Sequence, residues 1–180
     1  MTAPTPNSAL TPVLLDGAGR RVARDPWCFL EDDQGIEACA DIVLSLDRLE
    51  EMAPQLAGRN GRLGVILRAG EEVERLAPFL PQLTLVAIEF PIFKDGRGLS
   101  AARLLRARYG FTGELRAVGA VLEDQLLFML RCGFNAFALK HAEPEAAFAK
   151  AAATFSNVYQ GGSDHRTAIA ALRRGEAGSP

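Results

Sequence analysis

From residue 41 onward, short apolar runs alternate with amphipathic stretches. The runs have the length and composition of β-strands, whereas the stretches between them repeat apolar side chains every three or four residues, as helices do. The expected strands are 42–46, 63–67, 83–90, 114–119 and 134–139, and the expected helices are 47–56, 71–80, 99–109, 123–132 and 144–155. Because strands that are apolar throughout are covered on both faces, we predict an α/β fold with a parallel sheet of about five βα units.

Two architectures fit this pattern: an open parallel sheet between helix layers, or a partial TIM-like barrel. A complete barrel of eight units typically needs about 250 residues, and the chain has 180. Before the first unit, apolar runs at 13–15 and 27–30 flank the turn-forming pair Asp16-Gly17. This arrangement predicts an N-terminal β-hairpin over 13–35. Either the hairpin or dimerisation could cover the exposed edge of the sheet, so the sequence does not decide whether the protein forms a homo-oligomer.

The chain divides into one expected domain and two tails. Residues 1–12 are rich in Pro, Ser and Thr and predict a disordered tail, and 161–180 predict a flexible C-terminal segment. The α/β domain then covers 13–160, with the βα units in 41–160. No secretory signal pattern and no apolar run of about 20 residues is present, so we expect a cytoplasmic protein that does not enter a membrane.

Composition narrows the classes of partner and cofactor. A formal net charge of −2 offers no basic field for nucleic acid. The cysteines Cys28, Cys39 and Cys132 are odd in number and widely spaced, which argues against a disulfide framework and against a metal site. The nucleotide-binding glycine motifs are also missing. No cofactor is evident from the sequence.

Candidate chemistry gathers where strands end. Glu89 closes an apolar strand, and the loop after it carries Lys94, Asp95 and Arg97 among glycines. In parallel α/β sheets ligands bind at the carboxyl ends of strands. Glu89 could act as an acid or base, with Lys94 stabilising a developing oxyanion. Alternatively, Glu89 forms a structural ion pair with Arg68 or Arg116, and the Asp95-Gly96 step is only a polar turn.

Further candidates come from the neighbouring elements. Lys94, Arg97 and the N-terminus of the following helix at Ser100 could hold a sulfate, phosphate or carboxylate group. Additional ligand-binding candidates occur at or near other strand ends: Arg68, Arg116, Gln125 and Lys140. His141, which follows the last strand, is the better placed of the two histidines for proton transfer.

The region from Phe90 to Leu139 resembles a bacterial family of unknown function from sulfate-assimilation operons. The resemblance is carried by Asp95-Gly96-Arg97-Gly98, the run 113–117 (GELRA), Asp124-Gln125-Leu126 and Arg131-Cys132-Gly133-Phe134. Members are labelled as oxidoreductases probably involved in sulfite reduction, a label that rests on gene neighbours. The resemblance therefore implies a role near sulfite reduction, sulfur metabolism and cysteine biosynthesis.

Three hypotheses follow. The first is an accessory protein of assimilatory sulfite reduction that binds a small sulfur oxyanion, or the sulfite reductase itself, at the strand ends. The second is an independent barrel-like enzyme that uses Glu89 as acid or base on a small molecule. The third is a non-catalytic interaction module, which a large apolar patch away from the strand ends would favour.

Overall fold

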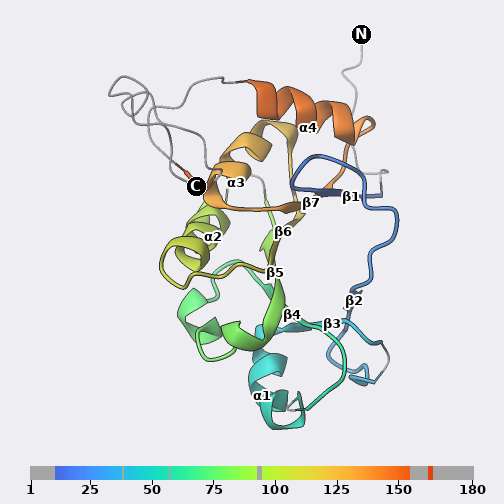
Figure 1. The fold of residues 1–180 in the computed structure, drawn as a ribbon, viewed down its shortest axis with the longest axis vertical. Coiled ribbons are helices and arrows are strands. Elements are labelled where there is room, and N and C mark those ends of the chain that lie inside the picture. The colour runs from blue at the N-terminus through green and yellow to red at the C-terminus, as the bar shows by residue number, and fades with distance from the viewer. Residues whose placement is uncertain (1–10, 38, 57, 93–94, 155–161, 164–180) are drawn as a thin grey trace.

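The fold is a curled seven-stranded open sheet, a half-barrel, with helices on its outer side (Figure 1). The computed structural model describes residues 11–37, 39–56, 58–92, 95–154 and 162–163. The strand order is β1-β7-β6-β5-β4-β3-β2, so strands β2 to β7 neighbour one another in the order of the sequence. The fold is thus mixed α/β, as the sequence predicts.

The sheet is mostly parallel. Its strands are β1 (Val13–Asp16), β2 (Cys28–Phe29), β3 (Ile42–Ser45), β4 (Leu63–Leu67), β5 (Leu83–Phe90), β6 (Glu114–Gly119) and β7 (Ala136–Leu139). Strands β2 to β7 run parallel, and β1 pairs antiparallel with β7, with Val13 opposite Leu139. The carboxyl ends of β2 to β7 therefore share one edge of the sheet.

The helices cover the outer side of this sheet. They are α1 (Leu46–Leu56), α2 (Arg97–Ala107), α3 (Leu126–Cys132) and α4 (Pro144–Ala153), with 3-10 turns η1 (Val73–Leu76), η2 (Leu80–Gln82) and η3 (Glu123–Gln125). The expected helix over 71–80 is wrong. Pro78 lacks the backbone N–H that a continuous helix would use, and it disfavours helical geometry at the preceding residue.

The predicted N-terminal hairpin is also wrong. The turn at Asp16 forms, because the carboxylate of Asp16 accepts the backbone N–H groups of Ala18 and Arg20, and Leu15 makes an isolated antiparallel bridge with Arg21. After one further hydrogen bond, from the Val22 N–H to the Leu14 carbonyl at 2.9 Å, the chain leaves β1. It crosses the inner face of the half-barrel, and β2 joins the opposite edge of the sheet (Figure 1).

Two apolar clusters hold the layers together. The larger one lies between the sheet and the helices and contains residues such as Ile88, Leu105 and Phe137. The smaller one, on the inner face, consists of Trp27, Val43, Leu85 and Ala87. The crossing segment thus brings Trp27 onto the sheet's inner face, which in a closed barrel would be filled by side chains of other strands.

The cysteines differ from expectation. Cys28, at the start of β2, and Cys39, in the loop before β3, form a disulfide across 11 residues, so the sequence-based argument against a disulfide is wrong. Spacing did not reveal it because the pairing depends on how the loop folds back. Cys132 is free and half-buried, and burial raises the pKa of its thiol.

Most of the two predicted tails, residues 1–10, 161 and 164–180, lies outside the described residues, as do residues 155–160 at the end of the predicted domain. Across the part of the chain that is described, none of the helices has the length and apolar character needed to span a membrane.

Candidate functional site

The carboxyl ends of β4 to β7 bring most of the candidate residues to one edge of the sheet. We call this edge the strand-end face. Its described residues are Arg68, Glu89, Ile92, Asp95, Arg97, Leu122, Glu123, Asp124, Gln125, Phe128, Lys140 and His141. Lys94, expected to act beside Glu89, lies outside the described residues.

Asp95 and Arg97 form a closed pair at the start of α2. The carboxylate of Asp95 accepts the backbone N–H of Arg97 at 3.1 Å and its guanidinium at 2.6 Å. These hydrogen bonds from Arg97 lower the pKa of Asp95 to about 2. Gly70, in the loop after β4, has a positive φ, and its open side lies against the Arg97 guanidinium. The pair thus links the loops that follow β4 and β5.

This pair already engages the Arg97 guanidinium and the Arg97 backbone N–H, two groups that an incoming anion would bind. Asp95 already neutralises Arg97 and takes a backbone N–H in the first turn of α2. The Ser100 backbone N–H donates to the Gly96 carbonyl at 3.4 Å. An oxyanion would therefore have to share or displace the Asp95 carboxylate. Within the described residues the Arg68 side chain has no ion pair, while its backbone N–H donates to Glu71 at 2.6 Å.

Glu89 lies half-buried on the inner face of β5. Its register partner on β6 is Val118, on the same side of the sheet. Neither of the predicted partners, Arg68 and Arg116, pairs with it. Among the described residues Glu89 has no ion pair or hydrogen bond through its carboxylate, a rare condition for a carboxylate in an apolar strand.

Arg116 is placed away from the strand-end face. It lies opposite Ala87, which precedes Glu89 by two residues and is therefore nearer the amino ends of the strands. The Arg116 side chain is 3% exposed. Its guanidinium donates to Asp25 at 2.5 Å and to Glu114 at 2.7 Å. Burial acts to lower the pKa of Arg116, but the hydrogen bond to Asp25 and the charge of Glu114 outweigh it and raise the pKa. Arg116 thus belongs to a structural network.

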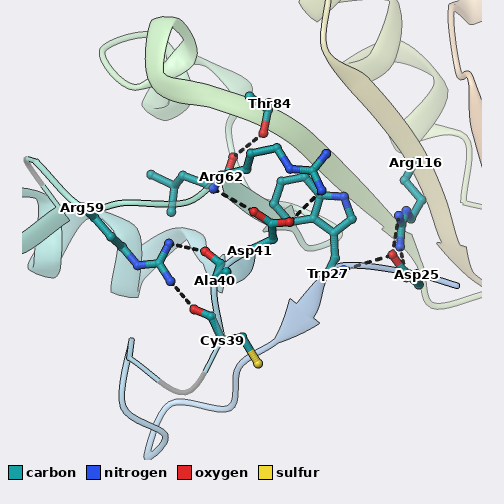
Figure 2. A network of polar contacts seen from close by, with 10 residues as sticks. Asp25, Trp27, Cys39, Ala40, Asp41, Arg59, Arg62, Thr84 and Arg116 are labelled. Atoms are coloured by element: carbon teal, nitrogen blue, oxygen red, sulfur yellow. Dashed lines mark hydrogen bonds and ion pairs between the residues drawn. The ribbon is translucent and has the colours of Figure 1, made fainter.

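Figure 2 shows this network, at the amino ends of the strands. We call it the amino-end network: Asp25, Trp27, Asp41, Arg62 and Arg116, which the figure labels, together with Glu114, which pairs with Arg116. Arg62 donates to Asp41 at 2.7 Å, and its guanidinium lies 4.9 Å from the centre of the Trp27 ring. Each described charge in the network faces an opposite charge or an aromatic ring, so the network stabilises the amino ends of the strands.

A pocket of about 540 Å³ opens between the ends of β6 and β7. Its lining combines apolar and charged side chains: Leu122, Glu123, Asp124, Leu127, Phe128, Lys140, His141, Lys150, Ala151 and Thr154. Of the predicted residues it contains Lys140 and His141, and Gln125 lies beside it in η3. The volume is in the range of small-molecule sites.

Glu123 organises the charged side of this pocket. It pairs with Lys150 at 2.8 Å and lies 3.5 Å from His141 Nε2. The hydrogen bond from Lys150, with a smaller effect of His141, lowers the pKa of Glu123. His141 Nδ1 accepts the Glu143 backbone N–H at 3.0 Å, so a neutral His141 carries its proton on Nε2, toward Glu123.

Sequence reasoning missed the apolar part of the strand-end face. Ile92, Leu122 and Phe128 are 59%, 40% and 58% exposed. A usable signal existed: each is a large apolar residue just beyond a strand or in the first turn of a helix, positions that usually carry polar side chains. Residues Asp25 and Trp27 of the amino-end network gave no such signal, because their partners are 35 to 91 residues away.

A family model matches residues 64–170, which is more than half of the chain. It describes a bacterial protein of unknown function, DUF934. The chain belongs to the DUF934 family. The matched region begins in β4 and includes every described residue of the strand-end face, whereas β1, β2 and the disulfide precede it. No curated protein matches the chain.

Proposed function

We propose that this protein is an accessory component of assimilatory sulfite reduction that docks on the sulfite reductase through its strand-end face. Two lines support the proposal. The resemblance of the 90–139 region to proteins from sulfate-assimilation operons indicates the process. The exposed apolar side chains of the strand-end face indicate a protein partner.

The second line is the observation that carries the proposal. Four large apolar side chains are prominently exposed in the described part of the chain, and three of them, Ile92, Leu122 and Phe128, lie on the strand-end face. Leu122 and Phe128 line the same pocket. Exposed apolar groups rimmed by charge are typical of protein interaction sites, where a few aromatic anchors carry most of the binding energy.

A protein partner fits this face better than a free oxyanion does. The cation best placed to hold an anion, Arg97, is already neutralised by Asp95. A docking partner, by contrast, can bury Phe128 and form charged contacts at the rim without breaking that pair. The proposed partner is therefore the reductase, and sulfite binding by the isolated chain is expected to be weak.

The test is copurification of the full-length chain with sulfite reductase, comparing two variants. Phe128→Ser removes the most exposed aromatic ring of the strand-end face, and we expect it to weaken binding at least tenfold, the cost of losing a central anchor. Phe29→Ser is the matched control: the same change at a ring that is 41% exposed but lies in β2, at an edge of the sheet. It should leave binding within a factor of two, and titration calorimetry measures both.

Failure of the wild-type chain to bind purified reductase, or equal loss in the two variants, would refute the proposed docking. An ultraviolet–visible spectrum of the copurified fraction identifies the reductase through its haem absorption.

A second function is favoured by one observation, the half-buried Glu89 carboxylate that has no partner in the described residues. An acid or base in an enzyme needs such a group. If the protein is an independent enzyme, a small molecule retained in native mass spectrometry should be lost in Glu89→Gln and kept in Phe128→Ser. Under the docking proposal, Glu89→Gln leaves the affinity for the reductase unchanged.

A further inference from the structure

The sequence shows no group able to carry electrons, but the fold creates one in the Cys28–Cys39 disulfide. Cys28 opens β2, the outermost strand of the sheet, and Cys39 ends the loop that leads to β3. Both residues are half-buried. In the described part of the chain β2 has a strand neighbour only on its β3 side.

The loop between the two cysteines is held by contacts that do not involve sulfur. Arg48, on α1 and 9% exposed, donates to the carbonyl oxygens of Glu31 and Gln34. The hydroxyl of Ser45 donates to Asp32 at 3.1 Å. These contacts fix the first part of the loop to α1 and to the end of β3.

Arg59 holds the second part of the loop. Its guanidinium donates to the carbonyl oxygens of Ile36, Cys39 and Ala40. Figure 2 shows the Cys39 carbonyl directed toward Arg59 and the sulfur directed away from it. The guanidinium thus anchors the backbone of Cys39 while leaving its sulfur outside these contacts.

The backbone around Cys28 is also held by hydrogen bonds that do not involve sulfur. Its backbone N–H donates to the Asp41 carbonyl at 2.9 Å, and the Leu30 N–H donates to the Val43 carbonyl at 3.0 Å. Reduction of the disulfide breaks none of these hydrogen bonds. Two thiols produced at Cys28 and Cys39 would therefore stay next to each other, ready to form the bond again.

We propose that Cys28 and Cys39 are a redox-active pair that exchanges two electrons with a dithiol protein. A thiolate of the dithiol attacks one Sγ, forming a mixed disulfide and releasing the other cysteine as a thiolate, which takes up a proton. The second thiol of the partner then displaces the remaining cysteine. The chain gains two electrons and two protons, and the partner is oxidised to a disulfide. This inference is independent of the docking proposal, because the pair lies outside the strand-end face.

The test uses the full chain carrying Cys132→Ser, so that every thiol detected comes from the pair. The protein is equilibrated in glutathione buffers with an increasing proportion of the reduced form, alkylated with iodoacetamide, and weighed by mass spectrometry. We expect the number of alkylated thiols to rise from zero to two and to return to zero on reoxidation. Structural disulfides resist reduction by glutathione, so this behaviour separates a redox-active pair from a structural one.

Trp27, the single tryptophan of the chain, reports the state of the fold in the same samples. It directly precedes Cys28, is 7% exposed and lies under Arg62. We expect its emission maximum to keep the wavelength of a buried indole while the thiols appear. A pair that stays oxidised in a large excess of reduced glutathione, or thiols that appear only together with a red-shifted emission, would overturn the proposal.

A second variant tests how the pair is held. Arg59→Ala removes three hydrogen bonds to the loop, and it should slow re-formation of the disulfide several-fold after the reductant is removed. Arg20→Ala is the matched control, since the Arg20 side chain is 80% exposed and pairs with Asp16 at the far edge of the sheet. Equal reoxidation rates in the two variants would contradict the role given to Arg59.

Discussion

The two ends of the parallel strands are built differently although they belong to the same sheet. At the amino ends, Arg62 and Arg116 are paired with carboxylates, and Trp27 is buried beneath the Arg62 guanidinium. At the carboxyl ends, Glu89 has no described partner, and large apolar side chains such as Phe128 face solvent. In complete barrels the amino ends of the strands serve stability and the carboxyl ends carry the binding residues. We propose the same division for this half-barrel.

The largest effect is expected at the amino-end network. Arg116→Ala leaves Asp25 and Glu114 without their shared cation on the inner face of the sheet. Breaking a buried ion pair costs about 3–5 kcal/mol, and because both carboxylates are partly exposed we expect about 2–3 kcal/mol. Urea denaturation measures the change. Phe128→Ser, at the other edge, should change the free energy of unfolding by less than about 0.5 kcal/mol. Similar costs for the two changes would refute the proposed division.

A smaller effect is expected where the strand-end face meets the sheet. Gly119 ends β6 with φ +88°, and a Cβ there would lie 2.5 Å from the Phe90 carbonyl oxygen. Gly119→Ala should cost about 2 kcal/mol through strain and this clash. Gly110→Ala is the control, because Gly110 also has a positive φ, +63°, but open space around it. Its cost should be about 1 kcal/mol, from strain alone. Thermal unfolding of the two variants separates the clash from the strain.

The smallest effect is expected at the Asp95–Arg97 pair. The pKa of Asp95, about 2, lies below the ordinary value of 3.8 for an aspartate, so the pair stabilises the fold above about pH 4 and this contribution is lost as the pH falls toward 2. Arg97→Ala should return the pKa of Asp95 toward 3.8 and leave the stability at neutral pH almost unchanged, since the pair is at the surface. Carboxyl-carbon NMR titration follows Asp95 directly. An unchanged pKa in the variant would show that Arg97 is not its partner in solution.

Much of the fold follows from the spacing of apolar residues. Strands β3 to β6 lie within a residue of the positions expected from their apolar runs, and α1 and α4 begin and end within two residues of the expected helices. These elements are local, and a few neighbouring residues decide them. The helix expected over 71–80 failed because Pro78 outweighed its apolar period.

The features that prediction missed are non-local. The route of the chain from Asp16 to Cys28, the pairing of Cys28 with Cys39 and the contact of Asp25 with Arg116 each depend on segments that meet only after folding. At the candidate site, Asp95, Arg97 and Lys140 lie at strand ends as their sequence positions indicated. Sequence could not show that Arg97 is already neutralised by Asp95, because that depends on the geometry of one turn.

The placement of β1 has a consequence for synthesis of the protein. This strand leaves the ribosome before the other described strands, but its only described strand neighbour is β7, with Asp16 opposite Ala136. Until more than a hundred further residues have been translated, the edge on which β1 docks does not exist. Although β1 precedes the other described strands in the sequence, it is thus among the last of them to find its place, because it can pair only after β7 has been translated.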